Sequence, residues 1–342
     1  MADDFWDKNG TAIASDAVIS VPAVLEGESE LRRAADYASA ARSKETQRAY
    51  ASDWRQFSRW LEQSPFADPP DEAVLGAYCA ALADRGMKAA SIRRRLAGVL
   101  WRLRTLDIAI NTADPRIREV VAGVVRRNGA PPVQKEPVFP DDLRAMVGAL
   151  GNDLRGVRDR AILLIGFAAA LRRSEIVGLD CGQGQSRDAT GWIEIVPQGA
   201  LIVVRGKAGW REAVVARGDT QYCPVRALEE WLYLGRIASG PVFRRIYGNA
   251  KGRVGVDRLS DRHVANLVKS AALAGGLRAE LPEAARAAAY AGHSLRSGFA
   301  SSSSALEADV QKQLGHANVN MTRRYRRRRD RFGVNLTKSV GL

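Results

Sequence analysis

The first half of the chain carries apolar residues at the spacing of amphipathic helices. After Ser43, the side chains of Tyr50, Trp54, Phe57 and Leu61 recur four, three and four residues apart and share one helical face. Ser43 is expected to cap this helix, because a serine hydroxyl accepts hydrogen bonds from the N–H groups of a first turn. The same period predicts three further helices: one through Val74, Tyr78 and Leu82 that ends at Gly86, one over Ile92–Leu106, and one near Pro115–Asn128.

A proline-rich stretch separates these helices from the rest of the chain. Pro131, Pro132 and Pro137 lie close together, and proline cannot continue a helix because its ring removes the backbone donor. Residues 129–139 are therefore expected to form an extended linker. Residues 1–30 show no sustained period and are expected to be a flexible arm. The predicted domains are thus a helical domain at residues 31–128 and a second domain at residues 140–342.

The second domain mixes helices with a few strands. Pro140 suits a first helical position, and a buried helix is expected over Val157–Leu171. Three runs rich in β-branched residues predict a small antiparallel sheet: Trp192–Val196, Leu201–Val204 and Ala213–Ala216. The remainder is predicted to be helical, over Cys223–Arg236, over Ser260–Ala274, after His293, and in two short helices ending near Phe332. The fold class is therefore mainly α, with an all-helical first domain and an α+β second domain.

The charge balance indicates a polyanionic partner. Lysine and arginine number 52 against 38 acidic residues, which gives a formal net charge of +14. A surplus of this size is typical of proteins that bind nucleic acid, although a basic, solvated surface is an alternative that charge alone leaves open.

The cysteines and the apolar runs limit which classes of protein the chain can belong to. Cys79, Cys181 and Cys223 lie far apart, so neither a disulfide framework nor a zinc site of ordinary spacing is expected. The apolar stretch at Ala161–Leu171 is too short to span a bilayer, and the acidic N-terminus has no signal-peptide pattern. We therefore expect a protein of the cytoplasm that is associated with the nucleoid.

The candidate catalytic residues are unremarkable one at a time. Arg172 and Glu175 are spaced like a helix-surface ion pair, which is worth only about 0.2–0.5 kcal/mol. His293 could be a helix cap and Arg296 a surface charge. His316 follows a glycine at an expected helix end, and Tyr325 could be a core tyrosine.

Taken together and in order, these residues form a coherent layout. The chain contains Leu171-Arg172-x-Ser174-Glu175, then Gly206-Lys207 in a turn, then His293-x-x-Arg296, and then Leu314-Gly315-His316 with Tyr325 nine residues after that histidine. This order resembles the tyrosine recombinase, or phage integrase, family. The likeness runs through residues 140–342, and the first domain resembles the family's core-binding domain. The two-domain layout is similar to that of Cre recombinase.

The resemblance implies a role for each residue of this set. Tyr325 would be the nucleophile that forms a 3′-phosphotyrosine, and Lys207 would protonate the departing 5′ oxygen, with Lys251 as a weaker rival. Glu175 would orient Arg172 rather than react. His293 or His316 could accept or share the proton of the tyrosine. No metal or other cofactor is expected.

Elementary chemistry agrees with these roles. A phosphodiester gains negative charge on its non-bridging oxygens as it becomes pentacoordinate, and Arg172 and Arg296 can grip those oxygens while staying charged. Such arginines supply the electrostatic stabilisation that Mg²⁺ gives other phosphoryl-transfer enzymes. A tyrosine with a pKa of about 10 is a poor nucleophile until neighbouring cations favour its phenolate.

The expected partner is double-stranded DNA with inverted-repeat target sites. By resemblance, four copies would hold two duplexes and exchange strands through a Holliday junction, whereas the free protein would be a monomer or a weak oligomer. Candidate DNA contacts are basic residues at or near helix starts and on helix surfaces: Lys44, Lys88, Arg93, Arg94, Arg95, Arg258 and Arg262. A type IB topoisomerase-like enzyme, a telomere resolvase-like enzyme and an inactive DNA-binding protein remain as alternatives.

Overall fold

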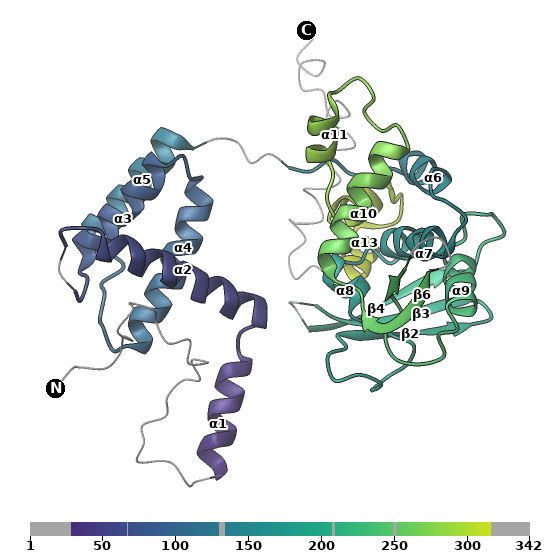
Figure 1. The fold of residues 1–342 in the computed structure, drawn as a ribbon, viewed down its shortest axis with the longest axis horizontal. Helices are drawn as coiled ribbons and strands as arrows, with labels where there is room; N and C mark the ends of the chain where they lie inside the picture. The colour runs from purple at the N-terminus through teal and green to yellow at the C-terminus, as the bar shows by residue number, and fades with distance from the viewer. Residues whose placement is uncertain (1–28, 67, 130–133, 207–208, 249–251, 316–342) are drawn as a thin grey trace. The chain divides into compact units, whose positions relative to one another are not determined.

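The structure, a computed structural model of the 342-residue chain, divides into two compact units between Pro132 and Val133 (Figure 1). It describes residues 29–66, 68–129, 134–206, 209–248 and 252–315. The division falls within residues 129–139, the stretch expected to be the linker. The predicted fold class, mainly helical with a small sheet in the second unit, is confirmed.

The first unit is built from helices alone within its described residues. Ser43 caps the second of them as predicted, since its Oγ accepts the backbone N–H of Thr46 at 3.2 Å. The first helix begins at Ser29, inside the stretch expected to be an arm, and the sequence pattern missed it because its small side chains are mostly alanine. The helices are α1 (Ser29–Ala40), α2 (Lys44–Glu62), α3 (Glu72–Asp84), α4 (Ala89–Thr105) and α5 (Pro115–Asn128).

The core of the first unit forms where α2, α3 and α4 meet. Phe57 and Tyr78 are buried and pack edge to face, with ring centroids 5.0 Å apart. Leu75, Val99 and Leu103 are also buried in this core. Apart from Leu75, these residues lie on the apolar faces that the helical period predicted, so burial of one face of each helix holds the unit together.

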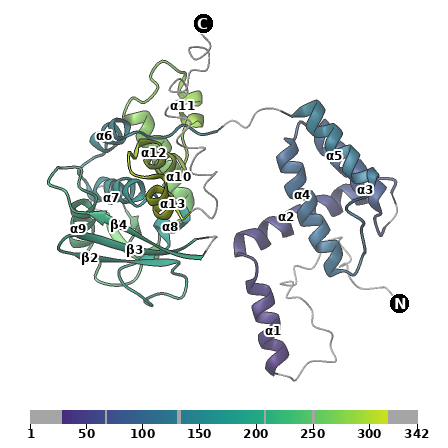
Figure 2. The same cartoon turned by 180° about the vertical axis from the view of Figure 1, so that it is seen from behind.

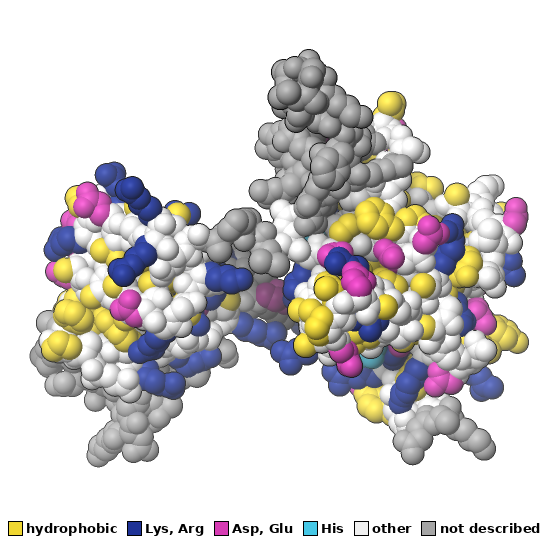
Figure 3. Space-filling model, turned by 90° about the horizontal axis from the view of Figure 1, so that it is seen from above, with side chains coloured by type: hydrophobic (Ala, Val, Ile, Leu, Met, Phe, Trp, Pro, Cys, Tyr) yellow, Lys and Arg dark blue, Asp and Glu magenta, His cyan; other side chains and the backbone are white. Residues whose placement is uncertain are grey.

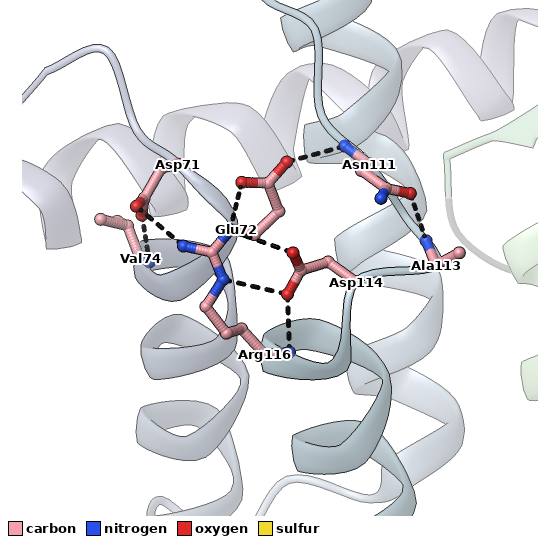
Figure 4. Close-up of polar contacts among 7 residues, drawn as sticks. All are labelled: Asp71, Glu72, Val74, Asn111, Ala113, Asp114 and Arg116. Atoms are coloured by element: carbon pink, nitrogen blue, oxygen red, sulfur yellow. Dashed lines mark hydrogen bonds and ion pairs between the residues drawn. The ribbon is translucent and has the colours of Figure 1, made fainter.

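An arginine network joins the starts of α3 and α5 (Figure 4). Arg116 donates to Glu72 at 3.1 Å and to Asp114 at 3.0 Å, and it lies 3.4 Å from Asp71. Asp71 also caps α3 by accepting the N–H of Val74 at 2.9 Å. The two helices approach closely beside this network. Arg116 is thus a structural arginine.

The second unit packs helices against a sheet (Figures 1 and 2). Its central helix is α7, with Ile162, Leu163 and Ile165 buried, and Trp231 of α9 packs in the same core while its Nε1 donates to the carbonyl of Val242 at 2.8 Å. The helices are α6 (Pro140–Gly148), α7 (Leu154–Ala168), α8 (Arg173–Val177), α9 (Pro224–Leu234), α10 (Asp261–Ala274), α11 (Glu283–Ala289), α12 (Ser294–Ser302) and α13 (Glu307–Leu314). Across the described residues, no helix is long and apolar enough to cross a membrane.

The main sheet contains the three predicted strands and one more. The strands β2 (Gly191–Val196), β3 (Gly199–Gly206) and β4 (Gly209–Ala216) are antiparallel neighbours, and β1 (Leu179–Asp180) pairs in parallel with β2. A second hairpin, β5 (Arg244–Tyr247) and β6 (Arg253–Arg258), lies where only helices were expected after the main sheet, so that expectation was wrong. The sequence missed it because both strands are short and β5, with two arginines followed by two apolar residues, does not show the alternation of a strand.

Part of the expected linker is packed onto the second unit. The N–H of Glu136 donates to Ala289 at 2.9 Å, and the N–H of Val138 donates to Ser294 at 3.0 Å, while the Val138 side chain is buried in the core. A Cβ added to Gly298 of α12 would lie 1.7 Å from the carbonyl oxygen of Val138. Residues 136–138 therefore belong structurally to the second unit.

We predict that Gly298→Ala destabilises the second unit by about 2–3 kcal/mol, because the added methyl would collide with backbone that cannot move without breaking the Val138 hydrogen bond. Chemical denaturation followed by tryptophan fluorescence measures the change. The matched control is Gly148→Ala in α6, where an added Cβ has no neighbour within 4 Å. An equal midpoint for both variants would contradict the prediction.

Candidate active site

The turn after α7 sets the position of Arg172. Ala170 has a φ of 50°, in the left-handed region that a residue with a Cβ seldom adopts, and it is fully buried. The turn ends the long helix and leaves Arg172 as the extended N-cap residue of α8. Glu175, in the first turn of α8, reaches back so that its Oε2 accepts the N–H of Arg172 at 2.9 Å. The spacing of three residues between Arg172 and Glu175 thus lets this hydrogen bond orient the carboxylate.

Three arginines surround the Glu175 carboxylate, whose side chain is only 4% exposed. Arg172 donates from Nη1 to Oε1 at 2.5 Å, and Arg211 donates from Nη2 to Oε2 at 2.9 Å. Nη1 of Arg296 lies 3.9 Å from Oε2. The structure therefore brings the two arginines that the sequence singled out to one carboxylate, and three guanidiniums against one carboxylate leave an excess of positive charge.

Arg296 lies inside the unit, with a side chain that is fully buried. Its Nη1 donates to the carbonyl of Ala170 at 2.7 Å, and its Nη2 donates to the carbonyl of Leu314 at the end of α13. Burial of a guanidinium is costly unless it is hydrogen-bonded, and these carbonyls meet that requirement. Arg296 thus joins α12 to the end of α7 and to the end of α13.

Glu175 stays ionised despite its burial. Burial alone would raise the pKa of its carboxyl group, but the N–H of Arg172 and the charges of Arg211 and Arg172 outweigh burial and hold the pKa below its ordinary value. A carboxylate at neutral pH can therefore keep all three arginines in place.

His293 is the N-cap residue of α12 and has a lowered pKa. Its side chain keeps contact with solvent, yet neighbouring atoms partly desolvate the ring, and the charges of Arg296 and Arg172 disfavour protonation further. The imidazole is consequently neutral at pH 7, the state in which a histidine can accept a proton.

The hairpin that leads to Lys207 ends beside this cluster. A Cβ added to Gly206 would lie 3.3 Å from Nη1 of Arg172 and 3.4 Å from Oε1 of Glu175, so the last residue of β3 packs against the ion pair. Lys207 itself lies outside the described residues, as does its rival Lys251.

The helix that precedes His316 and Tyr325 in the chain ends at the cluster, where the carbonyls of Gln313 and Leu314 accept from Arg211 and Arg296. The helix α13 ends at Leu314, and Gly315 closes it with a φ of 60° in the left-handed conformation that suits a glycine cap. His316 follows directly and, like Tyr325, lies outside the described residues.

Arg211 is a site residue that the sequence reasoning missed. It lies on β4 opposite Val204, with a side chain only 8% exposed. The alternation of the strand held a signal, since Arg211, Ala213 and Val215 occupy every second position and the latter two are buried in the core. An arginine on the core side of a strand needs a buried partner, and here that partner is Glu175.

The candidate DNA contacts divide according to their partners. Arg258 was expected to contact DNA, but its side chain is only 13% exposed, and it pairs with Asp180 at 2.7 Å and Asp188 at 3.1 Å. It also donates to the carbonyls of Val177 and Leu179, at 2.8 Å and 3.1 Å, so it fastens β6 to β1.

Two of the candidate basic residues in the first unit also have side-chain partners within the protein. Both terminal nitrogens of Arg94 bind the buried carboxylate of Asp53 at 2.6 Å, and Arg95 donates to Gln56. Arg93 and Lys88 are exposed, as is Arg262 of α10 in the second unit. Lys44 is the first residue of α2. Basic side chains lie on the surfaces of both units (Figure 3).

We find no candidate metal site among the residues that the structure describes. No group of three or more His, Cys, Asp or Glu side chains among those residues could hold a metal ion.

Comparison with known proteins identifies both units. Residues 138–331 match the phage integrase family, and residues 36–100 match the phage integrase N-terminal SAM-like domain. An integrase/recombinase XerD homologue from Selenomonas ruminantium is 31% identical over 294 residues, covering 82% of this chain and 80% of that protein. Tyrosine recombinase XerC from Xylella fastidiosa strain 9a5c is 31% identical over 295 residues, covering 83% of this chain and 86% of the relative.

Solved structures share the fold. XerH site-specific recombinase bound to a palindromic difH substrate, in a post-cleavage complex, aligns with a TM-score of 0.59 and 17% identity over 86% of this chain and 79% of that one. A lambda integrase dimer bound to a COC′ core site aligns with a TM-score of 0.53 and 17% identity over 88% of this chain and 95% of that one. The chain belongs to the phage integrase family of tyrosine recombinases and is a site-specific DNA recombinase.

Proposed function

We propose that this recombinase cleaves and rejoins DNA through a covalent 3′-phosphotyrosine at Tyr325, using the cluster around Glu175 to bind the scissile phosphate. The observation that carries the proposal is the excess of positive charge around this one buried carboxylate. A buried site with surplus guanidinium charge favours an anion, and a phosphodiester is the anion that DNA offers.

The phosphate is bound by Arg172 and Arg296. The side chain of Arg172 is 27% exposed and that of Arg296 is fully buried, so Arg172 is the one that solvent and substrate reach first. Both cations remain charged as the phosphorus becomes pentacoordinate, and fixed charges stabilise that transition state without reorganisation.

Attack by the phenol oxygen of Tyr325 forms a bond to phosphorus and breaks the bond from phosphorus to the 5′ oxygen. The phenol loses its proton to His293, whose lowered pKa keeps it neutral and able to accept. The 5′ oxygen receives a proton from Lys207, whose neighbour Gly206 packs against the Arg172–Glu175 pair. His316, the next residue in the chain after the α13 cap, is the alternative acceptor of the phenol proton.

Energy of the broken bond is retained in the phosphotyrosine ester. A 5′ hydroxyl from a second duplex can therefore reverse the reaction without ATP, which exchanges strands. Four copies holding two duplexes with inverted-repeat sites would complete exchange in two rounds through a Holliday junction, with the protein located at the nucleoid. Exposed Arg93, Lys88 and Arg262 are the side chains we propose as contacts to DNA, together with Lys44.

We predict that Tyr325→Phe abolishes the covalent adduct and leaves sequence-specific DNA binding largely intact, because the phenylalanine lacks only the attacking oxygen. Denaturing electrophoresis of protein mixed with a nicked target duplex detects the adduct, and gel shift measures binding. Any adduct formed by this variant would assign the nucleophile elsewhere.

Lys207→Ala should slow cleavage of an ordinary phosphodiester by about 100-fold or more, the usual contribution of a general acid. A 5′-bridging phosphorothiolate should restore the rate, since its sulfur leaves without a proton. Single-turnover adduct formation on both substrates checks this. Lys251→Ala is the matched control, and a rescue seen only with that variant would transfer the role to Lys251.

Cleavage should rise with pH through a midpoint below about 6.5, the ordinary pKa of histidine, and then level off near neutrality. The sign follows from the lowered pKa of His293, whose neutral form is the base and persists to lower pH than in a free histidine. His293→Asn should flatten this acid limb, whereas His316→Asn should retain it. A limb that survives in His293→Asn but vanishes in His316→Asn would make His316 the base.

A further inference from the structure

We propose that Arg211 is a positioning residue that holds the base of the lysine hairpin and the end of α13, ahead of the proposed nucleophile in the chain, to the phosphate-binding cluster at the same time. The proposal rests on the function proposed above, since it assigns a further residue to that reaction. We do not assign Arg211 to the phosphate, and its effect would pass through Lys207 and Tyr325.

The first link is to the cluster itself. Nη2 of Arg211 donates to Oε2 of Glu175 at 2.9 Å, the same oxygen that accepts the N–H of Arg172. The two side chains are 8% and 4% exposed, so water competes little for this ion pair. Arg211 is therefore fixed relative to Arg172, which we assign to the phosphate.

The second link is to the hairpin. Arg211 is on β4 opposite Val204, only two residues after Gly209, which pairs with Gly206 at the hairpin end. Anchoring Arg211 anchors the base of this turn, and Gly206 then rests against Arg172 and Glu175. Lys207 is the next residue in the chain, so its backbone starts from a point that the Arg211–Glu175 pair holds.

The third link is to the helix before the nucleophile. Nη1 of Arg211 donates to the carbonyl of Gln313 at 2.6 Å, and a Cβ added to Gly315 would lie 2.5 Å from Cδ of Arg211. The Gln313 side chain adds a bond to the carbonyl of Ala168 at 3.2 Å. The C-terminal end of a helix attracts cations, so these contacts hold α13 where it leads into His316.

A purely stabilising role does not account for this residue. Removing one partner of a buried ion pair destabilises a protein mainly because the other charge is left uncompensated. Arg211→Met removes the bonds to Glu175 and Gln313 but leaves Glu175 paired with Arg172. Stability should therefore change little, whereas the geometry of two catalytic segments is lost.

The test uses the full-length protein and the inverted-repeat duplex that the wild type selects from random-sequence DNA, nicked in its spacer to trap the adduct. Arg211→Met should bind this duplex within about threefold of wild type, with an unchanged thermal midpoint. Single-turnover cleavage at saturating protein should fall by about 100-fold, the size that misplacement by about 1 Å can cause. Cleavage at the wild-type rate, or binding that falls as much as cleavage, would overturn the proposal.

A substrate with a 5′-bridging phosphorothiolate distinguishes the effect of Arg211 on the lysine hairpin from its effect on the nucleophile. It bypasses Lys207 and should bring Lys207→Ala close to the wild-type rate, whereas Arg211→Met should recover only in part and stay about tenfold slow. Full recovery would confine Arg211 to the lysine hairpin, and no recovery would confine it to the nucleophile. Either result would sink the claim that it holds both.

Two further variants complete the design. Arg211→Lys keeps the buried cation but reaches Glu175 or the Gln313 carbonyl rather than both, so its rate should lie between those of wild type and Arg211→Met. It also serves if the methionine variant does not fold, and a rate equal to wild type would then refute the role. The matched control is Arg217→Met, which breaks the Arg217–Glu229 pair, at 2.7 Å, just after β4, and should leave cleavage unchanged. If the wild type forms no adduct, the proposed function fails instead.

Discussion

The buried carboxylate of Glu175 is the charge on which the arrangement of the site depends. It contacts Arg172 and Arg211 directly and lies 3.9 Å from Arg296, so it gathers cations from α7–α8, β4 and α12. Without this anion, three guanidiniums at such short separation would repel one another in a poorly hydrated interior. With it, they still carry surplus charge. Compensation is therefore partial, which is the condition for a preformed anion site.

Backbone carbonyls also stabilise these guanidiniums, although their dipoles do not cancel the surplus charge. The end of α13 offers the carbonyls of Gln313 and Leu314 to Arg211 and Arg296, and the strained turn at Ala170 offers a third. These dipoles belong to elements whose positions are fixed by the core, so they cost no reorganisation when substrate binds. The unfavourable left-handed φ of Ala170 is consistent with strain held at a functional turn.

Packing from outside fixes the helix that carries Arg296. The Val138 side chain is buried in the core beside α12, and its N–H donates to the Ser294 carbonyl. The Val138 carbonyl oxygen occupies the space that a side chain at position 298 would need, and Gly298 has none. The end of the linker is thus part of the support of the site. Only a glycine permits this approach, so backbone packing and side-chain chemistry constrain the same nine-residue helix.

Sequence period predicted most of the fold, because long amphipathic helices and a β-branched hairpin leave clear patterns, and motif order named Arg172, Glu175 and Arg296, which the structure brings together. The alanine-rich α1 and the arginine-bearing β5–β6 hairpin left none. The sequence also did not indicate which individual arginines are internal and which are exposed. Arg258 and Arg211 are internal because Asp180, Asp188 and Glu175 lie beside them in space, far away in sequence. Net charge counts such paired arginines with exposed ones such as Arg93, so it indicates a polyanionic partner without saying which residues touch it.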